Sequence, residues 1–109
     1  MTVLEEVLEE EYDRSIRLSG HVKEELATLP KGSVRTRTIK GHEYYYLNYR
    51  DGSKVRSDYI PADQVDEVRQ KVERRKQLKA VLKEQEQTRK QIKRALGKGA
   101  AIRDALHHK

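Results

Sequence analysis

The chain has 109 residues, no cysteine and a net charge of +6, with 39% charged and 35% apolar residues. This length predicts a single domain, residues 1–109, with a thin core, and the lack of cysteine excludes disulfides, thiolate nucleophiles and cysteine-ligated zinc. No apolar run approaches the roughly 20 residues of a membrane span. The N-terminus also lacks the basic start and apolar block of a secretory signal, so we expect a soluble, cytoplasmic protein.

The net charge hides a strong segregation along the chain. Residues 1–30 carry a charge of −5, residues 31–60 carry +4 and residues 61–109 carry +7. An acidic first segment and a basic last segment predict that the two pair with each other. The remaining positive charge is then expected on the middle segment and on the distal C-terminal half.

The first segment reads as one amphipathic helix over residues 2–29. Thr2-Val3-Leu4-Glu5 fits a capping box, and Pro30 excludes helical geometry for the residue before it. A break at Ser19-Gly20 is the alternative, because an interior glycine costs about 1 kcal/mol relative to alanine. Six apolar residues fall within about 80° of one another on this helix and are expected to form its apolar face: Leu4, Leu8, Leu18, Val22, Leu26 and Leu29.

From Gly32 onward the apolar period changes to two, which is typical of strands. Residues 33–39, 43–50 and 54–60 are rich in Val, Thr, Tyr and Ile, and Lys40-Gly41 and Asp51-Gly52 separate them. Aspartate and glycine both tolerate a positive φ, so the second pair is a strong hairpin signal. The sequence therefore predicts a three-stranded antiparallel meander over residues 33–60.

The last segment predicts a second long helix over residues 62–96, with Asp63 as its N-cap. Its apolar stripe is imperfect, which favours a loose antiparallel pairing with the first helix. Gly97-Lys98-Gly99 reads as a hinge, and residues 97–109 as a flexible or short helical tail. The expected fold class is therefore α+β, a long antiparallel, coiled-coil-like helical hairpin capped by a three-stranded antiparallel β-meander.

The candidate binding site lies on the predicted sheet, where aromatic and basic residues alternate. Alternation sends Tyr45, Leu47 and Tyr49 to one face, which looks buried, and Tyr44 and Tyr46 to the other. Arginine, lysine and tyrosine on one surface suit contact with phosphates and bases. The alternative is that these residues simply suit exposed strands over a thin core. The predicted nucleic-acid-binding residues are Arg35, Arg37, Lys40, Tyr44, Tyr46, Arg50, Lys54 and Arg56.

A second basic set on the last helix could add phosphate contacts, although a solvated coiled-coil face is the alternative. Lys31-Gly32-Ser33 is too short for a phosphate loop, and the four histidines show no metal-ligand spacing. No catalytic constellation stands out, so we expect a protein that is not an enzyme and that uses no metal and no cofactor. The residues of the second set are Arg89, Lys90, Lys93 and Arg94.

About a third of the chain resembles an uncharacterised family of small bacterial and phage proteins. The resemblance rests on residues 29–34, 39–47, 49–52 and 54–60, which follow a pattern "LPKGS…YYYL.YR.G.KV.S.Y". In that family a short sheet of this kind precedes a charged coiled-coil helix, so the resemblance implies an architecture and not an activity. The sheet also resembles the three-stranded arm-binding domain of phage-type integrases, which lays a meander into DNA, but the chain has no recombinase domain.

These observations lead to three hypotheses. The first is a small, basic, non-enzymatic protein of phage or mobile-element origin that binds nucleic acid, DNA in preference to RNA, through its Arg/Lys/Tyr-rich sheet. The alternative is a protein that binds and inhibits a nucleic-acid-handling host defence enzyme, as anti-CRISPR inhibitors do. The third is a structural coiled coil that forms a homodimer through its imperfect stripe. None of the three requires contact with a membrane.

Overall fold

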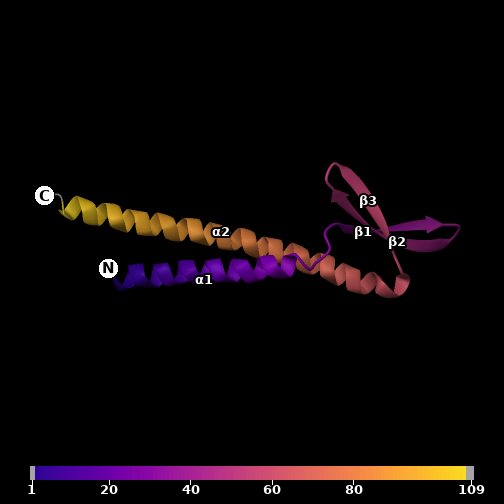
Figure 1. Cartoon of the computed structure of the whole chain (residues 1–109), viewed down its shortest axis with the longest axis horizontal. Helices are drawn as coiled ribbons and strands as arrows, with labels where there is room; N and C mark the ends of the chain where they lie inside the picture. The colour runs from indigo at the N-terminus through magenta and orange to yellow at the C-terminus, as the bar shows by residue number, and fades with distance from the viewer. Residues whose placement is uncertain (1, 108–109) are drawn as a thin grey trace. The chain divides into compact units, whose positions relative to one another are not determined.

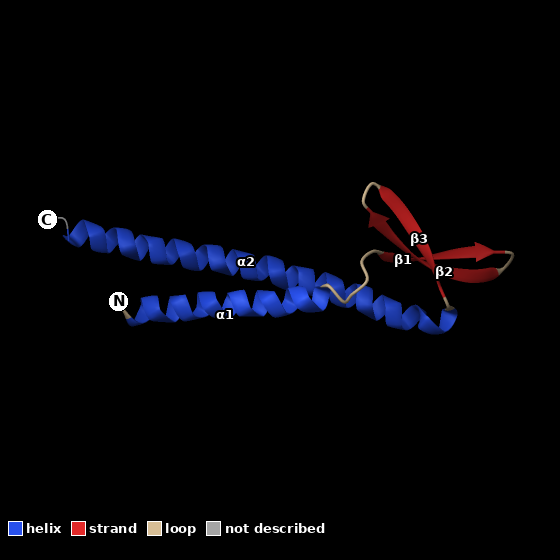
Figure 2. Ribbon diagram, in the orientation of Figure 1, coloured by secondary structure: helices blue, strands red, loops and turns tan. Residues whose placement is uncertain are grey.

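The computed structural model describes the backbone of residues 2–107 and the side chains of residues 2–97. The fold is α+β, with two long helices packed together and a three-stranded antiparallel meander (Figures 1 and 2). The chain divides into two compact units. We call residues 1–25 with 80–109 the hairpin unit, and residues 26–79 the sheet unit. The elements are α1 (Val3–Leu26), β1 (Ser33–Ile39), β2 (His42–Asp51), β3 (Lys54–Ile60), a 3-10 turn (Ala62–Gln64) and α2 (Val65–His107).

Helix α1 runs without a break through Gly20, so the uninterrupted helix predicted from the sequence is confirmed. The Thr2 hydroxyl accepts a hydrogen bond from the Glu5 backbone N–H at 3.2 Å, which caps the first turn as expected. The predicted end at residue 29 is wrong, because α1 stops at Leu26. Arg75 Nη1 donates to the carbonyl oxygens of Leu26 (2.9 Å) and Leu29 (3.3 Å), so this side chain satisfies carbonyl groups that have no helical N–H partner where α1 ends.

The hairpin unit pairs α1 with the second part of α2 in antiparallel fashion. Its seam is more polar than the sequence predicted, because Ser15 and Ser19 are buried beside Val22. Ser15 Oγ donates to Gln85 Oε1 at 2.8 Å, and Arg89 Nη1 donates to the hydroxyl oxygens of Ser15 (2.9 Å) and Ser19 (2.7 Å). Small serines let the long Arg89 side chain lie between the helices. Two residues of the predicted apolar face are instead exposed: Leu4 and Leu18.

Helix α2 differs from its prediction at both ends. Asp63 does not cap it, because this residue lies in the 3-10 turn, whose N-cap is Pro61 without a side-chain hydrogen bond. The predicted hinge at Gly97-Lys98-Gly99 is also wrong, since α2 continues as one helix of 43 residues to His107. Each interior glycine costs only about 1 kcal/mol, and extending an existing helix is easier than nucleating a new one. Two glycines among good helix formers therefore do not end it.

The sheet has the order β1-β2-β3, which confirms the predicted meander. The pairing of β1 with β2 runs from Ser33↔Asn48 to Ile39↔His42, and that of β2 with β3 from Tyr45↔Ile60 to Asp51↔Lys54. The sheet is therefore three strands wide only at residues 45–48 of β2. Each end of β2 extends beyond this centre in a two-stranded arm with a single partner.

The two hairpin turns differ in how well the sequence predicted them. Lys40 (φ 52°) and Gly41 (φ 81°) form the first turn as expected, and Lys40 is the one non-glycine residue with positive φ in the described chain. The second turn uses Gly52-Ser53 and not Asp51-Gly52, because Asp51 still pairs with Lys54. Glycine then occupies the first turn position at φ 63°, a conformation that it adopts without a steric cost.

The core of the sheet unit forms between one face of the sheet and the first part of α2. Ile60, Val65 and Val72 are buried in this unit, with 4–7% of their surface exposed. The Arg69 guanidinium lies 5.6 Å from the ring centroid of Tyr45, so a cation–π contact adds to the apolar packing.

None of the helices within the described residues is long and apolar enough to cross a membrane.

Candidate nucleic-acid interface

The register assigns every strand residue to one of two faces, because side chains alternate along a strand. The helix-side face includes Tyr45 and Leu47, packs on α2 and is completed by Val34, Thr36, Thr38, Glu43, Tyr49, Asp51, Lys54, Arg56, Asp58 and Ile60. The open face is the opposite one. Its residues are Ser33, Arg35, Arg37, Ile39, His42, Tyr44, Tyr46, Asn48, Arg50, Val55, Ser57 and Tyr59.

Charge is divided unequally between these two faces. All three acidic residues of the strands (Glu43, Asp51 and Asp58) lie on the helix-side face, while the open face carries three arginines and no acid. The whole sheet unit has thirteen basic and seven acidic residues, so it holds the entire +6 charge of the chain. The hairpin unit is neutral. An anion approaching the open face therefore meets guanidinium groups without a neighbouring carboxylate.

The centre of the open face is a row of three side chains across the sheet. Tyr46 on β2 lies between Arg35 on β1 and Tyr59 on β3, which are its direct cross-strand partners. The rings of Tyr46 and Tyr59 meet edge to face, with centroids 5.9 Å apart and an interplanar angle of 69°. The Arg37 guanidinium lies 5.4 Å from the Tyr46 ring centroid. Tyr46 is thus half-buried by its neighbours, whereas Tyr59 is 58% exposed.

The remaining predicted residues of the open face lie on its two arms. Arg37 is the cross-strand partner of Tyr44 on the β1–β2 arm, which ends at Lys40 in the turn. Arg50 lies on the β2–β3 arm, opposite Val55. Arg50 is four positions beyond Tyr46, a distance of about 13 Å along the strand. The structure therefore brings Arg35, Arg37, Tyr44 and Tyr46 together and places Arg50 apart from them.

Two of the predicted residues, Lys54 and Arg56, are not on this surface. Both lie on the helix-side face, opposite Asp51 and Tyr49 in the register. Arg56 Nε donates to Asp51 Oδ2 at 2.7 Å, so its charge is already paired in the sheet. These two residues cannot act together with Tyr44 and Tyr46 on one flat ligand.

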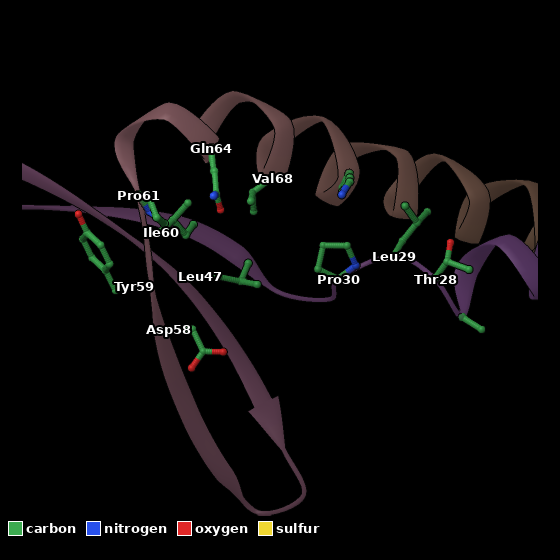
Figure 3. Close-up of a pocket in the computed structure, with 12 residues that line it drawn as sticks. Thr28, Leu29, Pro30, Leu47, Asp58, Tyr59, Ile60, Pro61, Gln64 and Val68 are labelled. Atoms are coloured by element: carbon green, nitrogen blue, oxygen red, sulfur yellow. The ribbon is translucent and has the colours of Figure 1, made fainter.

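The helix-side face carries a groove beside the segment that joins α1 to β1 (Figure 3). The groove has a volume of about 500 Å³ and is lined by Pro30, Leu47, Ile60, Val68 and Asp58, among others. The Tyr49 hydroxyl donates a hydrogen bond to the neighbouring Asp58 carboxylate. This bond is the main cause that raises the pKa of Tyr49, and partial loss of solvent is the second. The carboxylates of this face thus engage groups of their own face, which makes it a poor anion site.

The second basic set lies in the hairpin unit and divides into structural and exposed residues. Arg89 is used in the helix seam by Ser15 and Ser19, so it is not available for phosphates. Lys93 lies 5.7 Å from the Tyr12 ring centroid and remains exposed, as do Lys90 and Arg94. These three exposed residues stay candidates for additional contacts.

Three exposed residues of the open face were not among the site residues predicted from the sequence. Tyr59 completes the central row, and Ile39 and Val55 are exposed to 47% and 70%. The length of the turn between β2 and β3 could have revealed the position of Tyr59. A two-residue turn after β2 fixes the parity of the register, which puts Tyr59 beside Tyr46 and moves Arg56 to the other face.

No group of three or more metal-binding side chains occurs within the residues that the structure describes.

Residues 2–70 match the family described as "Domain of unknown function (DUF6788)", and the chain belongs to this family. The matched region includes α1, the whole sheet and the start of α2. No curated protein and no solved structure matches the chain. The family relationship therefore adds no assigned activity to the geometry of the open face.

Proposed function

We propose that this member of the DUF6788 family binds nucleic acid through the open face of its sheet. The observation that supports the proposal most is the segregation of charge by the register. Arg35 and Arg37 lie beside Tyr44 and Tyr46 on a surface without a carboxylate, while all acids of the strands lie on the other face. Guanidinium groups bind phosphates, and tyrosine rings offer stacking surfaces to bases.

The ligand contact would begin at the central row and continue along the β1–β2 arm. Arg35, Arg37 and Lys40 follow one another along this arm and would contact successive phosphates. Tyr59 would supply the most exposed ring. Phosphate contacts carry no sequence information, so affinity would depend strongly on salt and only modestly on base sequence.

Fluorescence anisotropy tests the proposal directly. Labelled duplex DNA, single-stranded DNA and RNA of equal length are titrated with the protein from about 50 to 200 mM salt, where phosphate-dominated binding weakens steeply. We expect binding that weakens with salt, with DNA preferred to RNA. The Arg35→Ala/Arg37→Ala variant should bind more weakly to every ligand. Absence of binding to all three at 50 mM salt would contradict the proposal.

The exposed apolar residues Ile39 and Val55 support a second candidate, a protein partner on the same face. This is the inhibitor of a nucleic-acid-handling defence enzyme, for which the open face would be a protein-docking surface with exposed apolar residues near its arginines. A pull-down from nuclease-treated lysate separates the two. Retention of a defined partner enzyme that depends on Val55 favours protein contact, and loss of all retention after nuclease favours nucleic acid.

A further inference from the structure

Helix α1 carries a second stripe at coiled-coil spacing, beside the one that packs on α2. The seam residues at positions 8, 12, 15, 19 and 22 follow steps of four and three. A parallel set follows steps of three and four about 90° around the helix. We call this set the outer stripe. It consists of Leu4, Val7, Glu11, Arg14, Leu18 and His21.

The outer stripe is open to solvent. Leu4 is 68% exposed, Val7 47% and Leu18 41%. The middle of the stripe holds an ion pair, Glu11 with Arg14 at 3.3 Å, whose side chains are 47% and 70% exposed. Single exposed apolar residues are normal on protein surfaces. Here they recur at the spacing that packs one helix against another, so the stripe is suited to a partner helix.

The four central positions of the stripe are complementary to themselves when read backwards, while Leu4 at one end lies opposite His21 at the other. In an antiparallel pair of α1 helices whose facing residue numbers add up to 25, Val7 of one copy lies opposite Leu18 of the other, and Glu11 lies opposite Arg14. Each pair occurs twice, related by a two-fold axis between positions 12 and 13. Such reciprocity is the defining property of an interface between identical chains.

We propose that the outer stripe is a homodimer interface, in which α1 of one copy packs antiparallel on α1 of a second copy. Val7 then meets Leu18, and each acid of the stripe faces a base. Residues 1–25 carry a charge of −5 and residues 80–109 a charge of +5, so each hairpin unit is neutral as a whole. The central Glu11 and Arg14 pairs set the register, because shifting the helices by a heptad would place charge against Val7 or Leu18.

Sedimentation equilibrium of the full chain without nucleic acid tests this interface independently of the proposed function. The wild type should show a mass that rises with concentration toward twice 12.8 kDa. Leu18→Glu should shift the protein to the monomer without lowering its helical circular dichroism, because this side chain is exposed. Ile16→Glu is the matched control. It adds the same charge at an exposed position on the opposite side of α1 and should leave the association unchanged.

A charge exchange separates contact between copies from the ion pair within one helix. Glu11→Arg places arginine opposite arginine across the dimer, and Arg14→Glu places glutamate opposite glutamate, so each variant alone should be monomeric. Mixed in equal amounts, the two variants should form a heterodimer, because both central stripe positions are then basic in one chain and acidic in the other. No intrahelical effect restores association on mixing.

The outcomes are decisive in both directions. A monomeric mass for the wild type up to about 1 mM, the weak end of specific association, would overturn the proposal. So would a dimer that survives Leu18→Glu, or a mixture of the two charge variants that remains monomeric. A wild-type dimer that both single variants dissolve and their mixture restores would establish the interface.

Discussion

Gly32 lies where the chain turns from the α1–β1 connection into the sheet, and replacing it should disrupt that turn. Its φ of 117° lies in the region that residues with a side chain rarely adopt. A Cβ atom would overlap the backbone oxygen of Asn48 and come within 2.9 Å of Tyr49 Cβ and 3.0 Å of the Asn48 carbonyl carbon. The obstacle is the backbone of the middle strand, which cannot rotate away as a flexible side chain would.

The expected cost follows from these two effects. The unfavourable backbone geometry costs about 1–3 kcal/mol. The overlap with β2 adds about 1–3 kcal/mol, the usual cost of forcing extra volume into a packed region. Gly32→Ala should therefore lower the free energy of unfolding by about 2–6 kcal/mol, a large part of the roughly 5–15 kcal/mol that stabilises a typical domain.

Urea titrations with two probes measure this effect. Five of the six tyrosines lie in residues 44–59, so tyrosine fluorescence reports mainly on the sheet, while circular dichroism at 222 nm reports on the helices. Gly20→Ala is the control, because Gly20 is helical and a Cβ there meets nothing within 4 Å. The control should gain about 0.5–1 kcal/mol. A Gly32→Ala variant within about 0.5 kcal/mol of the wild type, the range of an ordinary surface substitution, would show that the added Cβ is accommodated without strain.

Three further substitutions test individual contacts. Lys40→Asn should raise the free energy of unfolding by up to about 1 kcal/mol in urea, because asparagine tolerates the positive φ of this turn better than lysine does; an unchanged midpoint would contradict this. Arg89→Ala should lower the free energy of unfolding by about 1.5–3 kcal/mol, followed by circular dichroism at 222 nm, because the substitution removes charged hydrogen bonds to Ser15 and Ser19. A loss below about 0.5 kcal/mol would show that water replaces these bonds. Tyr49 has a raised pKa in the folded chain, so its contribution to stability is present below the unfolded pKa of about 10 and is lost as the pH rises through the folded pKa. The wild type should therefore lose stability above pH 10 more steeply than Tyr49→Phe, and equal slopes would exclude the hydrogen bond to Asp58 as the cause.

The sequence contained enough information for the elements and less for their packing. Alternation and turn residues predicted the meander, and helical spacing predicted both long helices. The seam of α1 was mispredicted because apolar spacing identifies Leu4 and Leu18, whereas the structure buries Ser15 and Ser19 around Arg89. A serine can be predicted as buried only when the position of the long polar side chain that contacts it on the other helix is known.

The candidate site depended on the register of the strands, which no local pattern states directly. Arg35 and Arg37 were assigned beside Tyr44 and Tyr46 only after the cross-strand pairs were fixed. Arg56 illustrates the reverse case, since composition groups it with the site and pairing with Asp51 removes it. Charge segregation between two faces of a sheet is thus a property of pairing and not of composition.

The salt dependence of DNA binding by two matched double variants shows whether the open face of the sheet binds phosphates. Arg35→Ala/Arg37→Ala removes two charges from the open face, while Lys76→Ala/Lys79→Ala removes two exposed charges from α2 in the same unit. If the open face binds phosphates, the first variant should make the negative slope of log K against log salt shallower by up to about 1.8 on duplex DNA, at about 0.9 per lost contact. The second variant should leave the slope nearly unchanged. Equal losses in both variants, or a loss only in the second, would contradict the account.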